Sequence, residues 1–203
     1  SKIDGNIFNS VVIVKNDNYM PLYNKHHLVP FGEYIPSFLK LLPIKKLTSG
    51  TIDFSKGIGP KTVDPKTLGV HTIPSFSPLI CYEAIFSGKV VDKNNRPNWL
   101  LNITNDIWFG DTTGPRQHAH ISKIRAIEEG LPMVRAANNG ISFVCDPFGN
   151  ILHMLELNQV GYIDFNLPQA IHRTIFSVFG NKLFLLALLL GFLSFSFLCG
   201  ENS

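Results

Sequence analysis

The sequence is poor in charged residues and in cysteine, and both shortages exclude classes of protein. Charged residues make up 16% of the 203 residues, the net charge is +3, and no run of like charges exceeds a pair. A nucleic-acid-binding face needs clustered Lys and Arg, so nucleic acid is not an expected partner. The three cysteines are too few for a disulfide framework, and without a CxxC pair they form no thiolate zinc knuckle.

The histidine pairs are also poor candidates for a metal site. His26 and His27 are adjacent, so in a strand their side chains would point to opposite faces. His118 and His120 are two positions apart on an expected helix, which also separates their side chains. A metal site at these histidines is therefore not expected.

Apolar residues are abundant, at 45% of the chain, which excludes a disordered polypeptide. The stretch of about 17 residues from Leu183 to Cys199 is almost entirely apolar. This length is at the lower limit for a helix that spans a membrane. A buried core helix is the alternative, but a helix that is apolar on all sides at a chain end has little core to enter. We therefore assign residues 175–203 to a transmembrane helix with a short tail.

The preceding residues, 1–174, alternate between strand and helix patterns and form one expected domain. Short apolar runs predict strands over residues 9–15, 19–28, 71–80, 99–103, 133–137, 141–145, 151–155 and 161–165. Pro115 and the spacing of apolar residues up to Leu131 predict a helix. Residues 48–67 predict a long Pro- and Gly-rich loop, of the kind that often forms a functional lid. This mixture indicates an α/β fold.

Cys81 is the first candidate for chemistry, because it follows an expected strand and precedes a segment that could open a helix. A thiol at such a turn projects outward, where a helix N-terminus lowers its pKa and offers N–H groups to an oxyanion. By position alone a buried core cysteine is the stronger interpretation, because free cysteine is among the most buried residue types. Tyr82 and Glu83 follow directly and bring ionisable groups to the same turn.

Lys25 is the second candidate, since it enters a Pro- and Gly-rich loop that also contains Glu33. Acyl transfer through a thioester needs a fixed positive charge near the oxyanion and a carboxylate that accepts the thiol proton. Taken by itself, Lys25 is more typical of a solvated surface lysine.

Several motifs, in order along the chain, together resemble the apolipoprotein N-acyltransferases of the nitrilase-like (carbon-nitrogen hydrolase) superfamily. They are residues 23–36 (YNKHHLVPFGEYIP), 78–83 (PLICYE), 102–110 (NITNDIWFG), 118–128 and 135–142 (RAANNGIS), followed by the terminal apolar run. The resemblance implies a nitrilase-like αββα sandwich with a Glu-Lys-Cys triad, set among transmembrane helices. It implies that Cys81 is the nucleophile and Lys25 the triad lysine, and that Glu33, Tyr82 and Glu83 support the site.

The resemblance also implies a reaction and a location. In this family a cysteine takes an acyl chain from a phospholipid as a thioester, then passes it to the α-amino group of the lipid-modified N-terminal cysteine of an apolipoprotein. The resemblance implies that this reaction needs no metal or dissociable cofactor. Phospholipid, apolipoprotein and membrane are thus the implied partners, and the periplasmic side of the bacterial inner membrane is the implied location. Arg173 and Lys182 precede the terminal helix, and by the positive-inside rule they would place the main domain in the cytoplasm. Large domains cross the membrane regardless of such charges, so we follow the location that the resemblance implies.

One departure from the family pattern concerns the triad glutamate, which in this family lies upstream of the lysine motif. Before Lys25 the acidic residues are Asp4 and Asp17, and neither lies in a matching motif. The chain also opens without Met or a signal segment. We therefore expect the C-terminal part of an acyltransferase, incomplete at its N-terminus and inactive alone. The alternatives are an amidase or nitrilase-type hydrolase, and a truncated or split, non-enzymatic fragment.

Other residues carry weaker predictions. Asp106, Trp108 and Phe109 either line the pocket or belong to a structural loop. Arg135 is expected in a buried ion pair, with contact to a lipid head group as the alternative. Cys145 is expected to be a small core residue near a strand end.

Overall fold

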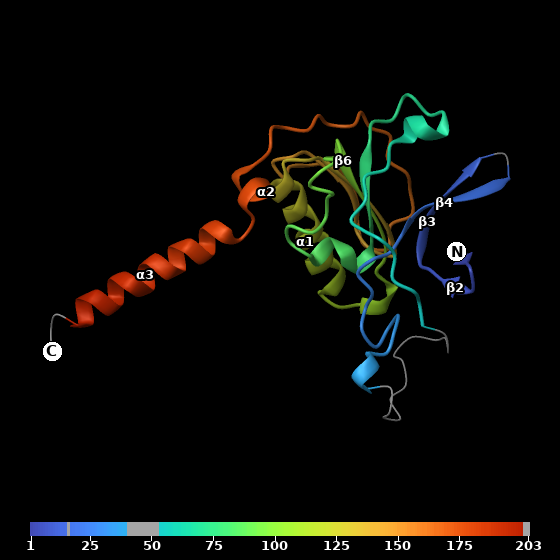
Figure 1. Ribbon diagram of the computed structural model, residues 1–203. Helices are drawn as coiled ribbons and strands as arrows, with labels where there is room; N and C mark the ends of the chain where they lie inside the picture. The colour runs from blue at the N-terminus through green and yellow to red at the C-terminus, as the bar shows by residue number, and fades with distance from the viewer. Residues whose placement is uncertain (16, 40–52, 201–203) are drawn as a thin grey trace.

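A five-stranded sheet forms the centre of the chain in the computed structural model, which describes residues 1–15, 17–39 and 53–200 (Figure 1). Its strands lie in the order β5-β6-β7-β8-β9, of which β5, β6 and β7 are parallel and the rest antiparallel. Their bounds are Phe76–Ile80 for β5, Trp99–Asn105 for β6, Met133–Asn138 for β7, Ser142–Cys145 for β8 and Ile151–Leu155 for β9.

Two crossover connections join the parallel strands, as parallel pairing requires. The 3-10 helix η3 (Cys81–Ile85) and a loop link β5 to β6, and helix α1 (Gly114–Glu129) links β6 to β7. Pro115 lies in the first turn of α1, and Gly130 ends the helix with a left-handed φ of 64°. Proline favours the first turn of a helix and glycine favours the position just after its end. The predicted helix is therefore confirmed, together with the residues that mark its two ends.

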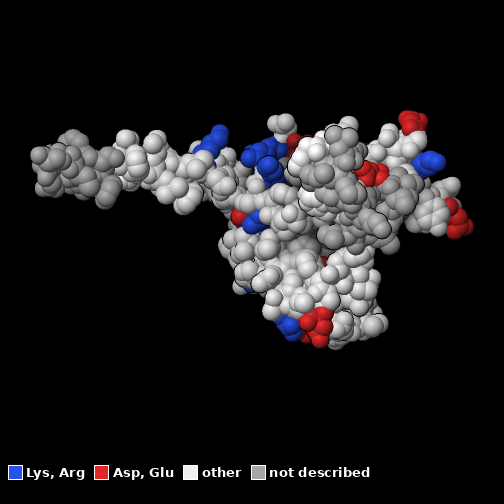
Figure 2. All heavy atoms as spheres, turned by 90° about the horizontal axis from the view of Figure 1, so that it is seen from below, with Lys and Arg blue, Asp and Glu red and all other residues white. Residues whose placement is uncertain are grey.

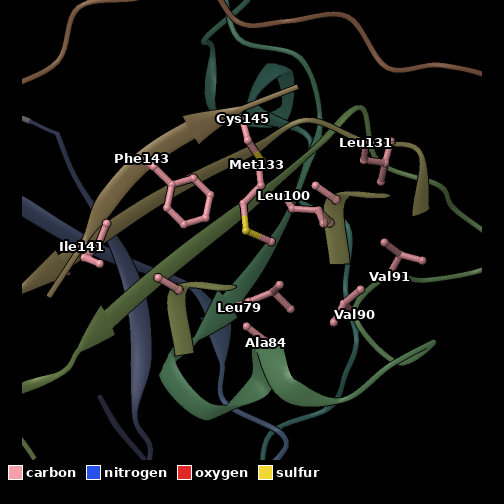
Figure 3. Packing of buried hydrophobic residues seen from close by; sticks show 12 residues of the cluster. Leu79, Ala84, Val90, Val91, Leu100, Leu131, Met133, Ile141, Phe143 and Cys145 are labelled. Carbon is pink, nitrogen blue, oxygen red and sulfur yellow. The ribbon is translucent and has the colours of Figure 1, made fainter. Parts of the chain in front are cut away.

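The main hydrophobic core lies between one face of the sheet and the layer formed by α1 and η3 (Figure 3). Its members include Leu79, Ala84, Leu100, Ala119, Ala126, Met133 and Phe143. The small alanine side chains of α1 and η3 let these helices approach the sheet closely, while the large side chains come from the strands. The turn at the start of η3 is therefore held between the sheet and α1.

The opposite face of the sheet packs against the antiparallel hairpin of β3 (Ser10–Lys15) and β4 (Asn18–Asn24). Leu22 of β4 joins a second cluster that contains Phe76 of β5 and Trp99 of β6. The described chain thus has three layers in the order helix, sheet, hairpin. In the described ranges no helix covers the outer side of the hairpin, where Val12 and Val14 are exposed.

The remaining elements are short. They are β1 (Lys2–Ile3), β2 (Asn6–Ile7), η1 (Ser37–Leu39), η2 (Pro65–Leu68), η4 (Ile107–Phe109) and α2 (Ile175–Phe179). The strand predicted over residues 161–165 is wrong, because this segment has no strand partner among the described residues and Tyr162 is exposed. Within the predicted loop 48–67, residues 53–64 are irregular apart from one bridge, and residues 48–52 lie outside the described residues.

Helix α3 (Lys182–Gly200) follows α2 and extends away from the rest of the chain (Figure 1). Its described apolar side chains, from Leu183 to Leu193, are exposed, and Figure 2 shows the projection as almost entirely uncharged. Across the described residues, no helix combines the length and the apolar character needed to cross a membrane. The predicted helix is present, but its membrane span is not confirmed.

Candidate active site

Cys81 lies where the chain turns from β5 into η3, so the predicted strand-to-helix turn is confirmed, with a 3-10 helix in place of an α-helix. Its φ of 50° falls in the left-handed region, which costs a non-glycine residue on the order of 1–2 kcal/mol. The side chain is half-buried, whereas that of Cys145 is fully buried, as predicted for a core residue. A strained and partly accessible cysteine is more typical of a reactive position than of a core position.

The carboxyl ends of three parallel strands meet beside this turn. Ile80 of β5 pairs with Ile103 of β6, which pairs with Ala136 of β7. Residues just beyond these pairs, including Cys81 and Asp106, therefore lie along one edge of the sheet. Open α/β sheets place their ligand and catalytic sites at this edge.

Glu83 is the buried carboxylate of the turn and connects it to a distant part of the chain. Its Oε2 accepts a hydrogen bond from the backbone N–H of Ile80 at 2.8 Å. Its Oε1 accepts from the Tyr23 hydroxyl at 2.7 Å and from the backbone N–H groups of His26 and His27 at 2.8 and 3.1 Å. The carboxylate thus fastens the Cys81 turn to the two residues that follow Lys25.

The charge of Glu83 is maintained by these donors. Burial alone would raise the pKa of Glu83, but the hydrogen bonds from His26, Ile80, Tyr23 and His27 lower it below its ordinary value. Burial and the charge of Glu83 in turn raise the pKa of Tyr23, so its hydroxyl stays a donor. Glu83 is therefore ionised, and both of its carboxylate oxygens already accept hydrogen bonds.

Lys25 is buried, with 1% of its surface exposed, so the interpretation as a solvated surface lysine is wrong. Its Nζ lies 2.8 Å from Oε2 of Glu33. The same carboxylate accepts from the backbone N–H of Val29 and from Nδ2 of Asn9, both at 2.8 Å. Glu33 thus fixes the ammonium group of Lys25, while Glu83 fixes the backbone just beyond it.

A buried network lies beneath the turn, centred on Arg135 of β7. The guanidinium donates to Asp106 Oδ2 at 2.7 Å and to Ser122 Oγ at 3.0 Å, and it also contacts Asn102. The predicted buried ion pair of Arg135 is therefore confirmed, and Asp106 belongs to this network. Burial alone would raise the pKa of Asp106, but His118 and Arg135 lower it, so Asp106 stays ionised.

His118 of α1 connects this network to the backbone of Cys81. Its Nδ1 lies 2.9 Å from Asp106 Oδ1, and its Nε2 lies 3.3 Å from the carbonyl oxygen of Cys81. Each ring nitrogen thus lies within hydrogen-bonding distance of an acceptor oxygen, and the ring links the backbone of Cys81 to Asp106. In the sequence, His118 was evident only as an unlikely metal ligand and as the first residue of a family motif; its contacts with Asp106 and Cys81 depend on the packing of α1 against the sheet.

The other predicted residues divide between the turn and the surface. Tyr82 follows Cys81 and packs edge-on against Phe86, with ring centroids 5.2 Å apart. Phe109 packs against His118, whereas Trp108 is 63% exposed. An aromatic pair therefore lies next to Cys81 in the sequence, and Phe109 contacts the histidine that reaches the Cys81 backbone.

Two described carboxylates contact the Lys25 and Cys81 segments, and both already have ion-pair or hydrogen-bond partners. Glu33 is paired with Lys25, and Glu83 accepts four hydrogen bonds. Asp4 is exposed. Within the described ranges, neither site carboxylate is free to accept a thiol proton without giving up an existing partner.

The expectation that His26 and His27 point to opposite faces is wrong, because β4 ends at Asn24 and both residues lie in the loop beyond it. Their ring centroids are 4.2 Å apart. One ligand atom from each ring and one from Glu83 lie within 4.8 Å of one another, so these three side chains have the spacing of a metal-binding group.

Comparison with known proteins identifies relatives for most of the chain. The sequence profile of the carbon-nitrogen hydrolase family matches residues 1–173. The apolipoprotein N-acyltransferase of Rickettsia prowazekii (strain Madrid E) is 49% identical over 175 residues, which cover 86% of this chain and 34% of the relative. The apolipoprotein N-acyltransferase of Bradyrhizobium diazoefficiens is 45% identical over 177 residues, which cover 86% of this chain and 32% of the relative.

Among solved structures, the carbon-nitrogen hydrolase of Helicobacter pylori G27 has a TM-score of 0.53 at 16% identity, covering 79% of this chain and 57% of that chain. At this identity the likeness concerns the fold, which is mixed α/β and nitrilase-like. The chain spans about a third of the length of the curated relatives it matches.

Proposed function

Because the chain belongs to the carbon-nitrogen hydrolase family, we propose that it is the cysteine-bearing part of an N-acyltransferase. The chain resembles enzymes named apolipoprotein N-acyltransferase at up to 49% identity, which supports acyl transfer over amide hydrolysis. The structural observation that carries the proposal is the bridge by Glu83, which joins the strained turn at Cys81 to the segment that bears Lys25.

In the first half-reaction the Cys81 thiolate attacks the carbonyl carbon of a phospholipid ester. A C–S bond forms, the ester C–O bond breaks, and the lysophospholipid leaves as an alcohol with the proton that the Cys81 thiol gave up. Lys25, held by Glu33, supplies positive charge to the tetrahedral oxyanion. A buried ammonium is effective in this role because the surrounding protein screens its charge less than water does.

In the second half-reaction the α-amino group of a lipid-modified N-terminal cysteine attacks the thioester. An amide C–N bond forms, the C–S bond breaks, and the proton lost by the amine restores the thiol. No cofactor enters this balance. Three residues act as positioning residues: Glu33 holds Lys25, Tyr82 packs against Phe86, and Glu83 holds the turn at Cys81.

The proton acceptor for the thiol is the part of the mechanism that the described residues do not supply. Glu33 and Glu83 each hold several donors in place, and taking a proton would break those hydrogen bonds. We therefore propose that residues 1–203 alone do not turn over, as the family position of the triad glutamate also implies.

The exposed apolar surface of α3 supports a location at a membrane. Its described side chains between Leu183 and Leu193 face away from the domain, and Figure 2 shows no charged spheres along this part of the projection. Burying such a surface in lipid would be favourable. We propose that this helix contacts the bacterial inner membrane and that the domain lies on its periplasmic side, as the resemblance implies.

The test is a chimera in which residues 1–203 replace the aligned third of the Rickettsia prowazekii enzyme. Incubated with a phospholipid, the chimera should form a thioester on the Cys81 peptide, seen by mass spectrometry and removed by hydroxylamine. The Cys81→Ser chimera should lack this thioester, with Cys145→Ser as the matched control that keeps it.

Acyl label that persists at another residue after Cys81→Ser would refute the assignment of the nucleophile. Lipid-independent hydrolysis of small amides by the chimera, without thioester formation from phospholipid, would favour the amidase alternative. Thioester formation by residues 1–203 alone would refute the proposal that this chain lacks its proton acceptor.

A further inference from the structure

A cavity of about 550 Å³ lies beside the loop that follows Lys25, and Cys81 does not line it. Its charged and titratable lining residues are His26, His27, Lys56, Lys89, Asp92 and Lys93. They come from three separate segments: the loop after β4, the irregular stretch before η2, and the loop after η3. Small-molecule sites have volumes of roughly 300–1,000 Å³, so the cavity is larger than a single ion needs.

The lining carries an excess of positive charge, with three lysines against a single aspartate. No ion-pair partner for Lys56 or Lys89 is found among the residues that the structure describes. Burial and neighbouring His26 lower the pKa of His27; the charge of Glu83 opposes this shift, and the charges of Lys89 and Lys56 add to it. The lysine charges therefore act on the cavity, and the one aspartate in its lining balances them only in part.

A buried nitrogen without a partner also belongs to this lining. His26 is 4% exposed, and its Nδ1 lies 2.8 Å from Glu83 Oε1. Its Nε2 is buried and has no hydrogen-bond partner in the described part of the chain, and the same holds for Nδ1 of His27. Leaving a buried polar atom unpaired is unfavourable, so both nitrogens favour contact with a polar ligand.

Charge decides whether that group is a cation or an anion. The spacing of His26, His27 and Glu83 suits a metal ion, but Glu83 Oε1 already accepts from Tyr23 and from two backbone N–H groups. A metal ion would have to displace those donors close to unpaired lysines that repel it. An anion instead attracts the lysines, and it leaves the hydrogen bonds of Glu83 intact.

We propose that this cavity binds a phosphate group, with Lys56 and Lys89 supplying charge and the unpaired ring nitrogens of His26 and His27 supplying hydrogen-bond contacts. The group can belong to a lipid phosphodiester head group or to free phosphate, because both present the same oxyanion. The site is argued from the charge and the unpaired nitrogens of the cavity, and it does not rest on the acyl-transfer proposal. Its test therefore measures binding instead of turnover.

Isothermal titration calorimetry on the purified chain at low ionic strength provides that test, with sodium phosphate, glycerophosphoethanolamine and sodium acetate as probes. Phosphate or the phosphodiester should bind at least tenfold more tightly than acetate. The double variant Lys56→Gln/Lys89→Gln should weaken binding by roughly tenfold, while Lys66→Gln, an exposed lysine outside the lining, should leave it unchanged. Tighter binding of the phosphodiester identifies a head group, and tighter binding of phosphate identifies the free ion.

His26→Gln gives an independent check of the histidine contact, and should weaken phosphate binding with little change in the affinity for acetate. Equal affinity for acetate and phosphate, or unchanged phosphate binding in the double lysine variant, would overturn the proposal. So would stoichiometric binding of zinc chloride that is lost in His26→Gln and unaffected by the lysine changes, because that result identifies a cation site.

Discussion

Replacing Glu83 by glutamine tests the central connection of the site. The change keeps the shape of the side chain but removes its charge and turns one acceptor into a donor. Oε1 receives Tyr23, His26 and His27, so the amide oxygen will take that position. The amide nitrogen then faces the N–H of Ile80, which leaves two donors opposed in a buried place.

The size of the effect follows from these contacts. Hydrogen bonds to a charged group contribute roughly 1.5–3 kcal/mol each, and a buried unsatisfied donor costs roughly 1–3 kcal/mol. Losing the bond to Ile80 and the charge that strengthens the others should lower the free energy of unfolding by about 3 kcal/mol. Glu83→Ala, which leaves all four donors unpaired, should cost more.

Stability against pH gives a second readout with a definite sign. The pKa of Glu83 is below its ordinary value in the folded chain, so the unfolded chain takes up the proton first as pH falls. The stabilisation is therefore complete above the ordinary pKa, near pH 4, and is lost as pH falls through the folded pKa. Glu83→Gln should remove this part of the acid sensitivity.

Urea unfolding of the wild type and the variant, followed by circular dichroism between about pH 3 and pH 7, measures both quantities. Glu156→Gln is the matched control, because Glu156 is exposed, and its effect should stay within about 0.5 kcal/mol. The reasoning is refuted if Glu83→Gln destabilises the chain no more than Glu156→Gln, or if both variants keep the same acid sensitivity.

Three further outcomes test other parts of the site. In the chimera, Lys25→Ala should slow thioester formation by about 10²–10³-fold while phospholipid binding, measured separately, is retained, since it removes charge at the oxyanion. Gly140→Ala should destabilise the chain by more than about 1 kcal/mol in urea unfolding, because a Cβ there would lie 2.2 Å from Asp106 Oδ2. Burial raises the pKa of Cys145 to about 11, so iodoacetamide at pH 8 should label Cys81 first, and peptide mapping that finds Cys145 labelled faster would contradict the assignment.

The regular elements of the fold were largely predictable from local pattern. Apolar runs placed the strands of the central sheet, and Pro115 and Gly130 marked the ends of α1. The segment 161–165 shows the limit of such patterns, because an extended run becomes a strand only if another strand is available beside it. That availability is a property of the assembled sheet and not of the run.

The sequence indicated residues for the candidate site, but it did not indicate their contacts. The motifs indicated Cys81, Lys25 and Glu33, and the buried ion pair of Arg135 was expected because an unpaired guanidinium is costly to bury. The bond from Glu83 to His26 spans 57 residues of sequence, and no local pattern records it.

The sequence by itself determined which elements form and which residue types stand at the turn, because periodicity and turn chemistry act over a few neighbouring residues. The tertiary structure decided how the loops meet. His26 and His27 lie beyond the end of β4, so strand alternation did not govern them and their rings came together. The cavity they share with Lys56 and Lys89 exists because three loops pack against one another. Loops lack a periodic pattern, so their meeting depends on the packing of the whole fold.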